Sequence, residues 1–176
     1  CNVASYLHTH TETNAEYLLC DTDKQMLKAY NEEQSYYLNK VFTTQDDVCI
    51  TSFVQDAKQI ILIAGLGGDA GTSAILHFAN ILNARKTQCL CILLYPFPFE
   101  GSKKKLQAND TIKLLQKQRH IEVSVFYNEQ LLKASRTTPM SEAFLRQNAE
   151  IAEFLNKKLN HISSLWERIK NMFHRL

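Results

Sequence analysis

Glycines are concentrated in one short segment of the chain, where they could form a phosphate-binding loop. Four of the five glycines are Gly65, Gly67, Gly68 and Gly71. An apolar run, residues 60–64, precedes the loop, and apolar residues with helical spacing follow over 71–85. Amides at the start of a helix attract anions, because the aligned peptide dipoles leave partial positive charge there. The segment therefore predicts a phosphate cradle, but Asp69 stands inside it.

Asp69 would oppose a bound phosphate. At about 4 Å, like charges repel by roughly 1 kcal/mol in water and roughly 4 kcal/mol at an effective dielectric of 20. Two arrangements would relieve this repulsion. The carboxylate could point away and cap the following helix, or it could hold Mg²⁺ against the phosphates. We favour the cap.

The composition is that of an ordinary globular chain. It has 176 residues, 45% hydrophobic and 22% charged, with a formal net charge of +2, so we expect one sizeable core and no nucleic-acid partner. The five cysteines show no zinc-site spacing. Cys89 and Cys91 alternate on an apolar run, which predicts buried free thiols in a reducing compartment. We identify no membrane span and no signal peptide, and we expect native residues before Cys1.

Strand and helix patterns alternate along the chain. We expect strands at 16–20, 60–64, 87–95 and 121–127, and helices at 21–30, 43–58, 71–85, 103–118, 129–134, 141–160 and 163–175. Residues 31–42 show no clear pattern. The nearly continuous apolar strands predict a parallel sheet with helices on both faces, a three-layer α/β fold.

The expected loops place polar groups at one edge of this sheet. They are DTD at 21–23, GLGGDAG at 65–71, PFPFEG at 96–101 and YNE at 127–129. Ligands of parallel sheets bind at the carboxyl ends of the strands. The pattern therefore predicts a ligand site where these four loops converge.

Six segments, in sequence order, resemble the N-terminal nucleotide-binding (GTPase) domain of FtsZ, the bacterial tubulin homologue. IAGLGGDAGTSA (63–74) is similar to the family loop A-G-x-G-G-G-T-G-T-G-A. YPFPFEGSKKK (95–105) matches the pattern P-F-x-F-E-G-x-[KR]-[KR] at Pro96, Phe97, Phe99, Glu100 and Gly101. The remaining segments are CNVASYL (1–7), AEYLLCDTDKQML (15–27), YNEQLL (127–132) and EAFLRQNAEI (142–151). The resemblance implies a Rossmann-like domain over residues 1–160.

The resemblance also implies a GTP or GDP site, with Mg²⁺ as a possible companion. The residues implicated in phosphate binding are Asn2, Gly67, Gly68, Asp69, Gly71, Thr72 and Lys104. Glu100 would accept ribose hydroxyls, and Asn128 would read the guanine edge. Phe144 would stack on the base and Asn148 would also read its edge, since residues four apart share one helix face. The alternative is that Phe144 belongs to the core and Asn148 to the surface.

Several positions depart from the family pattern. Asp69 and Ala70 replace a glycine and a threonine, and Asp21 replaces an asparagine. Lys104 stands where the family has an arginine, so it offers a point charge rather than a two-pronged fork. The segment 40–51 lacks the family's G-x-G-A-G phosphate loop.

The end of the chain departs furthest. We expect 161–176 to be an amphipathic C-terminal helix, with no second domain and none of the acids that complete a neighbour's active site in FtsZ filaments. The chain would then be at most a weak GTPase. We expect the helix to pack on apolar surface, with partner contact and membrane contact as less favoured alternatives.

These features favour a divergent, cytoplasmic, FtsZ-like protein that binds guanine nucleotide, with a role in cell division or filament assembly. Its partner would be itself or FtsZ. The alternative is an interaction protein that docks on FtsZ filaments and caps or regulates them without nucleotide. A small enzyme acting on another phosphorylated ligand is a weaker option, because the loops show no evident base or nucleophile.

Overall fold

The computed structural model describes the backbone of residues 6–7, 16, 18–28, 35–38, 41–57, 59–134 and 139–173. Side chains are described for the same residues, apart from Met26, 132–134 and 161–173. The chain divides into two compact units, residues 17–130 and a second unit of 1–16 with 131–176. The predicted boundary at residue 160 stays a prediction.

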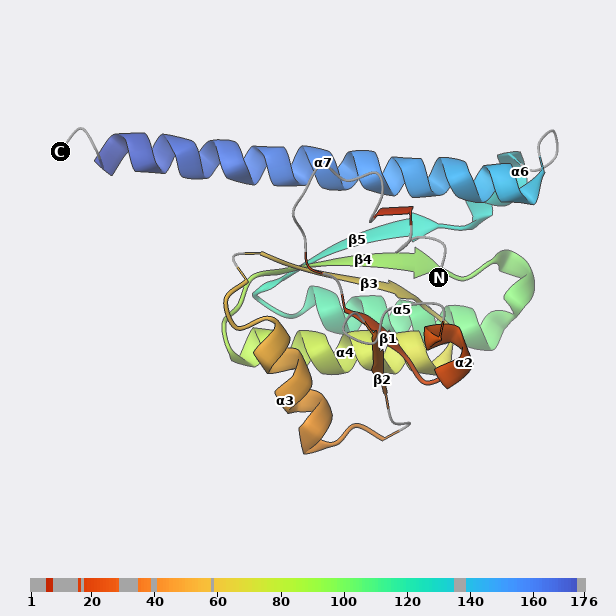
Figure 1. Cartoon of the computed structure of the whole chain (residues 1–176). Helices are drawn as coiled ribbons and strands as arrows, with labels where there is room; N and C mark the ends of the chain where they lie inside the picture. Colours follow the sequence, from red (N-terminus) through yellow and green to blue (C-terminus); the bar gives the residue numbers. More distant parts are fainter. Residues whose placement is uncertain are drawn as a thin grey trace. The chain divides into compact units, whose positions relative to one another are not determined.

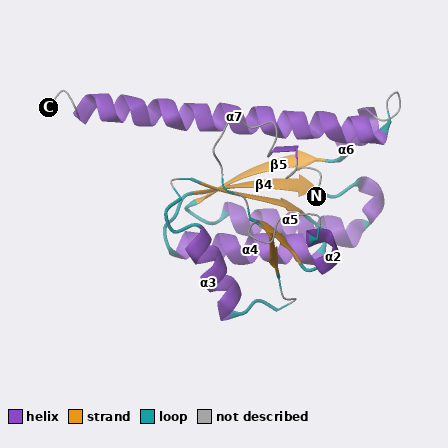
Figure 2. Ribbon diagram, viewed as in Figure 1, coloured by secondary structure: helices purple, strands orange, loops and turns teal. Residues whose placement is uncertain are grey.

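The larger unit is built around two parallel sheets (Figures 1 and 2). One pairs β1 (Leu19–Asp21) with β2 (Ser35–Tyr37). The other has the order β3-β4-β5, formed by Ile60–Gly65, Cys89–Tyr95 and Ile121–Tyr127. The parallel α/β class predicted from the apolar strands is confirmed. Strand β2 falls in the stretch 31–42, where no pattern was recognised, because its three residues are too few to show alternation.

The helices of this unit follow the strands. They are α2 (Lys24–Leu27), α3 (Thr44–Phe53), α4 (Asp69–Ala84) and α5 (Ser102–Gln116), with the short 3-10 turn η2 at Pro98–Glu100. Helix α4 begins two residues before the predicted start at 71. Helix α3 ends at Phe53 rather than at 58.

Helices α4 and α5 cover one face of the three-stranded sheet (Figure 1). The core between them contains Ile75, Ala79, Leu82, Cys89, Cys91, Leu93, Ala108 and Leu115, all buried. A second cluster joins the two sheets: Phe78 of α4 packs with Leu38 and Ile50, and Cys20 and Leu62 lie against it. Helix α4 therefore contributes to both clusters, which anchors the segment that follows the glycine loop.

Cys89 and Cys91 are buried and free, as predicted; Cys20 and Cys49 are also free and partly buried. Burial is the largest influence raising the pKa of the Cys20 thiol, to about 12. The Cys20 thiol is therefore protonated and unreactive near neutral pH.

The smaller unit contains α6 (Glu129–Ala134, at the junction) and α7 (Met140–Phe173). We expected two helices, 141–160 and 163–175, but α7 is continuous over 34 residues. The side chains of the predicted amphipathic segment 161–176 lie outside the described residues. No helix in the described ranges is both long and apolar enough to cross a bilayer.

Candidate functional site

The three strands of the larger sheet end at a common edge. In the pairing register Gly65 lies opposite Leu94, and Tyr95 lies opposite Tyr127. The glycine loop after β3, the PFPFEG loop after β4 and Asn128 after β5 consequently start at one edge, as the sequence predicted. The DTD loop follows β1 in the other sheet, where the Asp21 carboxylate accepts the Asp23 N–H at 3.0 Å.

The backbone of the glycine loop is shaped by two glycines. Leu66 N–H continues the strand ladder by donating to Leu94 O at 2.9 Å. Gly67 then turns the chain at φ +87°, a conformation that suits glycine. A Cβ on Gly71 would lie 2.3 Å from Gly65 O, so helix and strand approach more closely than any side chain would allow. This close approach places the first turn of α4 beside the carboxyl end of β3, at the edge of the sheet.

Thr72 fastens the loop to its helix. Its buried Oγ1 accepts the Gly67 N–H at 3.0 Å, and its own N–H donates to Gly68 O at 3.2 Å. The amides of Gly67 and Thr72 are therefore engaged within the protein. In an α-helix that starts after Gly68, the N–H groups from Gly68 to Gly71 have no intrahelical acceptor. Those amides are the donors that α4 can offer to a ligand.

Asp69 does not cap α4, so the favoured interpretation of this residue is wrong. The N-cap is Gly68, and no described side chain makes a cap hydrogen bond there. Asp69 is the first helical residue and is exposed, and within the described ranges its carboxylate has no hydrogen bond or ion pair. A carboxylate in the first turn interacts favourably with the helix dipole. It would compete with an external anion for the same positive end.

Glu100 and Lys104 form an ion pair beside the glycine loop. Glu100 Oε2 accepts from Lys104 Nζ at 2.9 Å, and Oε1 accepts from Phe97 N–H at 2.7 Å. The hydrogen bond from Lys104, with that from Phe97, holds the pKa of Glu100 below its ordinary value despite partial burial. Sequence reasoning placed both residues at the site but missed their pairing, because Glu100 ends the 3-10 turn and Lys104 lies in α5, so no helical spacing rule joins them.

The first turn of α5 packs directly on the glycine loop. A Cβ built on Gly67 would lie 2.9 Å from Lys104 Cβ and 3.3 Å from Pro96 Cβ. Glycine is thus required at position 67 for space as well as for conformation. The structure therefore brings seven of the predicted site residues together at the glycine loop and the start of α5: Gly67, Gly68, Asp69, Gly71, Thr72, Glu100 and Lys104.

Of the remaining predicted residues, Asn128 lies at the same sheet edge, and the others lie in α7 or outside the described residues. Asn128 forms the turn after β5 and is half-buried. Phe144 and Asn148 lie one turn apart in α7, within the smaller unit. Asn148 is 2% exposed, and its Oδ1 has no hydrogen-bond partner in the described part of the chain. It is therefore not the surface residue of the alternative interpretation. Asn2 lies outside the described residues.

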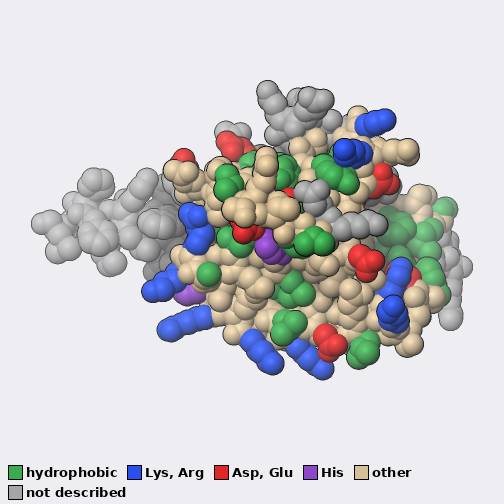
Figure 3. All heavy atoms as spheres, turned by 90° about the horizontal axis from the view of Figure 1, so that it is seen from below, with side chains coloured by type: hydrophobic (Ala, Val, Ile, Leu, Met, Phe, Trp, Pro, Cys, Tyr) green, Lys and Arg blue, Asp and Glu red, His purple; other side chains and the backbone are tan. Residues whose placement is uncertain are grey.

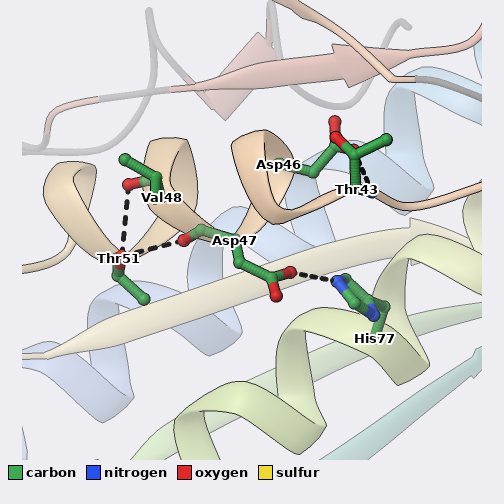
Figure 4. A network of polar contacts seen from close by, with 6 residues as sticks. All are labelled: Thr43, Asp46, Asp47, Val48, Thr51 and His77. Atoms are coloured by element: carbon green, nitrogen blue, oxygen red, sulfur yellow. Dashed lines mark hydrogen bonds and ion pairs between the residues drawn. The ribbon is translucent and has the colours of Figure 1, made fainter.

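Helix α3 occupies the segment where the family's G-x-G-A-G loop is missing. Thr43 N–H and Thr43 Oγ1 both donate to Asp46 Oδ2, at 2.6 and 2.7 Å, in a capping box (Figure 4). Burial raises the pKa of Asp46, but the hydrogen bonds from Thr43 and Tyr36 and the charge of His77 together outweigh it, so the pKa lies below its ordinary value. The start of α3 is therefore satisfied by its own residues.

A second contact links α3 to α4. His77 Nε2 lies 2.6 Å from Asp47 Oδ1 (Figure 4), and its ring stacks on Phe42 with centroids 4.2 Å apart.

No group of three or more His, Cys, Asp or Glu suited to a metal occurs among the described residues. In the view of Figure 3, basic and acidic side chains are interspersed, and hydrophobic side chains form separate groups.

Several solved structures share this architecture. An empty FtsZ dimer from M. jannaschii matches with a TM-score of 0.72 and 20% sequence identity, over 88% of this chain and 50% of that chain. CetZ from Methanosaeta thermophila matches with a TM-score of 0.74 and 15% identity, over 90% of this chain and 50% of that chain. TubZ from Clostridium botulinum phage c-st matches with a TM-score of 0.69 and 16% identity, over 90% of this chain and 55% of that chain. No protein-family model matches the chain.

The chain therefore has an FtsZ/tubulin-like N-terminal domain fold, which confirms the fold expected from the ordered motifs. It spans about half the length of the solved structures that it matches.

Proposed function

We propose that this FtsZ-like chain binds a guanine nucleotide, GTP or GDP, at the carboxyl edge of β3, β4 and β5. The N-terminus of α4 carries the proposal. It presents backbone N–H groups from Gly68 to Gly71, and no described side chain caps them. A diphosphate or triphosphate supplies acceptor oxygens and negative charge, which are what such a helix end attracts.

One further observation supports a phosphate-bearing ligand at this edge. Lys104 lies against Gly67, so a cation is available at the glycine loop. The choice of a nucleotide follows from the resemblance of the ordered motifs to the FtsZ N-terminal domain. The base contacts expected of Phe144 and Asn148, in the smaller unit, stay predictions.

Asp69 weakens this site rather than abolishing it. Its charge is exposed, so solvent screens its repulsion of a phosphate. Mg²⁺ would reduce the repulsion further, because a divalent ion accepts carboxylate and phosphate oxygens together. We therefore propose binding that depends on Mg²⁺ through Asp69. The function would lie in cell division or filament assembly in the cytoplasm, with little or no hydrolysis of GTP by this chain alone.

The test is calorimetric titration of GTP and GDP, with and without Mg²⁺, into wild type, Asp69→Asn and Asp110→Asn. Asp110 is an exposed acid on α5 and serves as the matched control. In Mg²⁺-free buffer, Asp69→Asn should bind at least about fivefold more tightly, because roughly 1 kcal/mol of repulsion is removed. Asp110→Asn should behave as wild type. Absence of heat for every form at millimolar nucleotide with Mg²⁺ would contradict the proposal.

A second function is favoured by the acidic groups at the site. Asp69 carries an exposed charge at the start of α4, and α3 closes its own N-terminus with Asp46, so the edge binds phosphate less well than the family pattern implies. The chain would then dock on FtsZ filaments and cap them without nucleotide. It should reduce FtsZ pelleting at substoichiometric ratios. Unchanged sedimentation over a full titration would exclude this function.

A further inference from the structure

Basic side chains gather at the edge of the three-stranded sheet opposite the glycine loop. We call this surface the basic edge, and its exposed members are Arg85, Lys86, Lys117 and Arg119. They lie on two loops, residues 85–88 between α4 and β4 and residues 117–120 between α5 and β5 (Figure 1). Because β4 and β5 pair with Cys89 opposite Ile121, the two loops enter the sheet side by side.

Hydrogen bonds fix these loops against α4 and against each other. Gln118 Nε2 donates to Asn80 Oδ1 at 2.6 Å. His120 N–H donates to Asn83 Oδ1 at 3.1 Å. Gln88 Nε2 lies 3.1 Å from His120 Nδ1 and so joins one loop to the other. The backbone of the basic edge is therefore already ordered, and a partner loses little affinity to ordering it.

The charge of the basic edge is not balanced locally. The two loops carry four Lys or Arg residues and no acid, whereas the whole chain has a net charge of only +2, so the rest of the chain is net acidic. In the part of the chain that the structure describes, none of the four cations has an ion pair. Other cations do pair with a glutamate four positions earlier: Lys104, Arg146 and Lys157. The described acids at this edge are Asp56, before β3, and Glu122, in β5. Positive charge therefore predominates, and it attracts an anionic partner.

Lys86 has a backbone conformation that favours glycine. Its φ is +59°, and no other non-glycine residue in the described ranges has a positive φ. Its N–H donates to Asn83 O at 3.0 Å. Helices commonly end with glycine in this conformation, because a Cβ is strained there. A residue that breaks a local rule without a local gain indicates a functional position.

Positive charge also stabilises helix C-termini, where the peptide dipoles leave partial negative charge. This effect accounts for Arg85 and Lys117, which are the C-cap residues of α4 and α5. It does not account for Arg119, which lies beyond the last turn of α5, because the dipole effect falls off within one turn. Nor does it explain why the strained position 86 holds a lysine.

We infer that the basic edge docks an acidic polypeptide segment of a partner protein, at a surface separate from the proposed nucleotide site. Glu and Asp side chains need only cations and N–H donors, which these loops offer. A membrane surface is bound through large apolar side chains as well as charge, and single-stranded nucleic acid through aromatic stacking. Residues 85–88 and 117–120 contain no large apolar side chain and no Phe, Tyr or Trp.

The test is fluorescence anisotropy of a labelled peptide of alternating glutamate and glycine, titrated with the full chain at low ionic strength. Two double variants neutralise one loop each: Arg85→Gln with Lys86→Gln, and Lys117→Gln with Arg119→Gln. Each should bind the peptide at least about fivefold more weakly than wild type, because two attractions are removed. Failure of wild type to bind the peptide would overturn the inference and leave the nucleotide site untouched.

The matched control is Lys28→Gln with Lys103→Gln, which removes two exposed charges of the larger unit outside the basic edge. It should stay within about twofold of wild type, because distant charges are screened. An equal loss in the control would mean that only net charge matters, which also overturns the inference. Vesicles containing phosphatidylserine and a single-stranded oligonucleotide are titrated alongside. Tighter binding of either one than of the peptide would overturn the acidic segment as the partner.

Lys86→Gly separates binding from stability. Glycine adopts the φ of Lys86 without strain, so Tm should rise by about 2–4 °C. Peptide affinity should fall by about twofold, because one exposed cation is lost. A lysine that serves only the helix end would give the opposite result, a lower Tm with unchanged affinity, and this would remove Lys86 from the docking surface.

Discussion

Helices α3 and α4 begin in different ways, although both follow parallel strands in the same unit. The first turn of α3 is closed by Thr43 and Asp46, which exchange backbone and side-chain hydrogen bonds. The first turn of α4 begins at Gly68, and no described side chain caps it. In α3, side chains of the first turn accept hydrogen bonds from nearby donors and stabilise the start of the helix. In α4, the first-turn N–H groups have no side-chain cap, so the start of the helix is held in place by packing instead.

The packing that secures α4 is seen at Gly71 and Thr72. Gly71 lets the helix touch Gly65 O, and Thr72 holds Gly67 N–H in the buried interior. The difference between the two helix ends can be tested by four changes, ordered from the largest expected effect on stability to the smallest.

Gly71→Ala should be the most damaging. Its methyl group would lie 2.3 Å from Gly65 O, which is backbone and cannot rotate away. Overpacking of this kind costs about 2–3 kcal/mol, a fall in Tm of about 5–10 °C for a chain of this size. Thermal unfolding followed by circular dichroism measures it. Gly65→Ala is the control, since nothing lies within 4 Å of its added Cβ; equal losses for the two variants would contradict the close approach.

Thr72→Val should cost about 1.5 kcal/mol, because it leaves the buried Gly67 N–H without its acceptor at nearly constant volume. Thr72→Ser should keep the hydrogen bond and most of the stability. Urea unfolding of the three forms gives the free energies of unfolding. If valine and serine are equally stable, the hydroxyl does not hold the loop.

Asp46→Asn should cost about 1 kcal/mol at pH 7, as expected for loss of a charged capping group. The pKa of Asp46 is lowered in the folded chain. Its contribution is therefore fully present above the unfolded pKa, near 4, and is lost as the pH falls through the lower folded pKa.

Chemical denaturation of wild type and Asp46→Asn at several pH values checks this dependence. The difference between them should shrink below about pH 4. A difference that is constant from pH 7 to strongly acidic pH would mean that the carboxylate charge does not cap α3.

Gly68→Ser should have the smallest effect on stability and would make α4 begin like α3. Gly68 has φ −96° and ψ 156°, and nothing lies within 4 Å of an added Cβ. A serine cap stabilises a helix by only a few tenths of a kcal/mol relative to glycine. The same hydroxyl would occupy amides that we assign to phosphate, so calorimetry should show weaker GDP binding. Unweakened binding would separate the phosphate site from these amides.

Much of the larger unit could be predicted from the sequence. The limits of β5 were predicted to the residue, and β3 was predicted apart from Gly65, because the apolar run of β3 and the alternating pattern of β5 are both typical of strands. The short strand β2 was missed, and the break expected near residue 161 is absent. Local propensity decides little at such positions, where pairing or helix continuation decides the outcome.

The candidate site divides in the same way. Glycine spacing predicted a strand, a turn and a helix N-terminus, because these depend on neighbouring residues. The N-cap role predicted for Asp69 was wrong, because the helix begins one residue earlier than that role requires, with Gly68 as the N-cap. Sequence patterns locate helix ends only to within one or two residues.

The sequence by itself determined the order of the strands and helices apart from β2 and the expected break in α7, the common edge of the loops after β3, β4 and β5, and the residue types offered there. Periodicity and backbone preference act over a few residues, so these features can be read locally. Only the tertiary structure decided that Thr72 turns inward to Gly67, that Lys104 packs on the glycine loop while bound to Glu100, and that Asn148 is buried. Those outcomes depend on which distant segments come into contact, and no local pattern encodes the distance between two side chains.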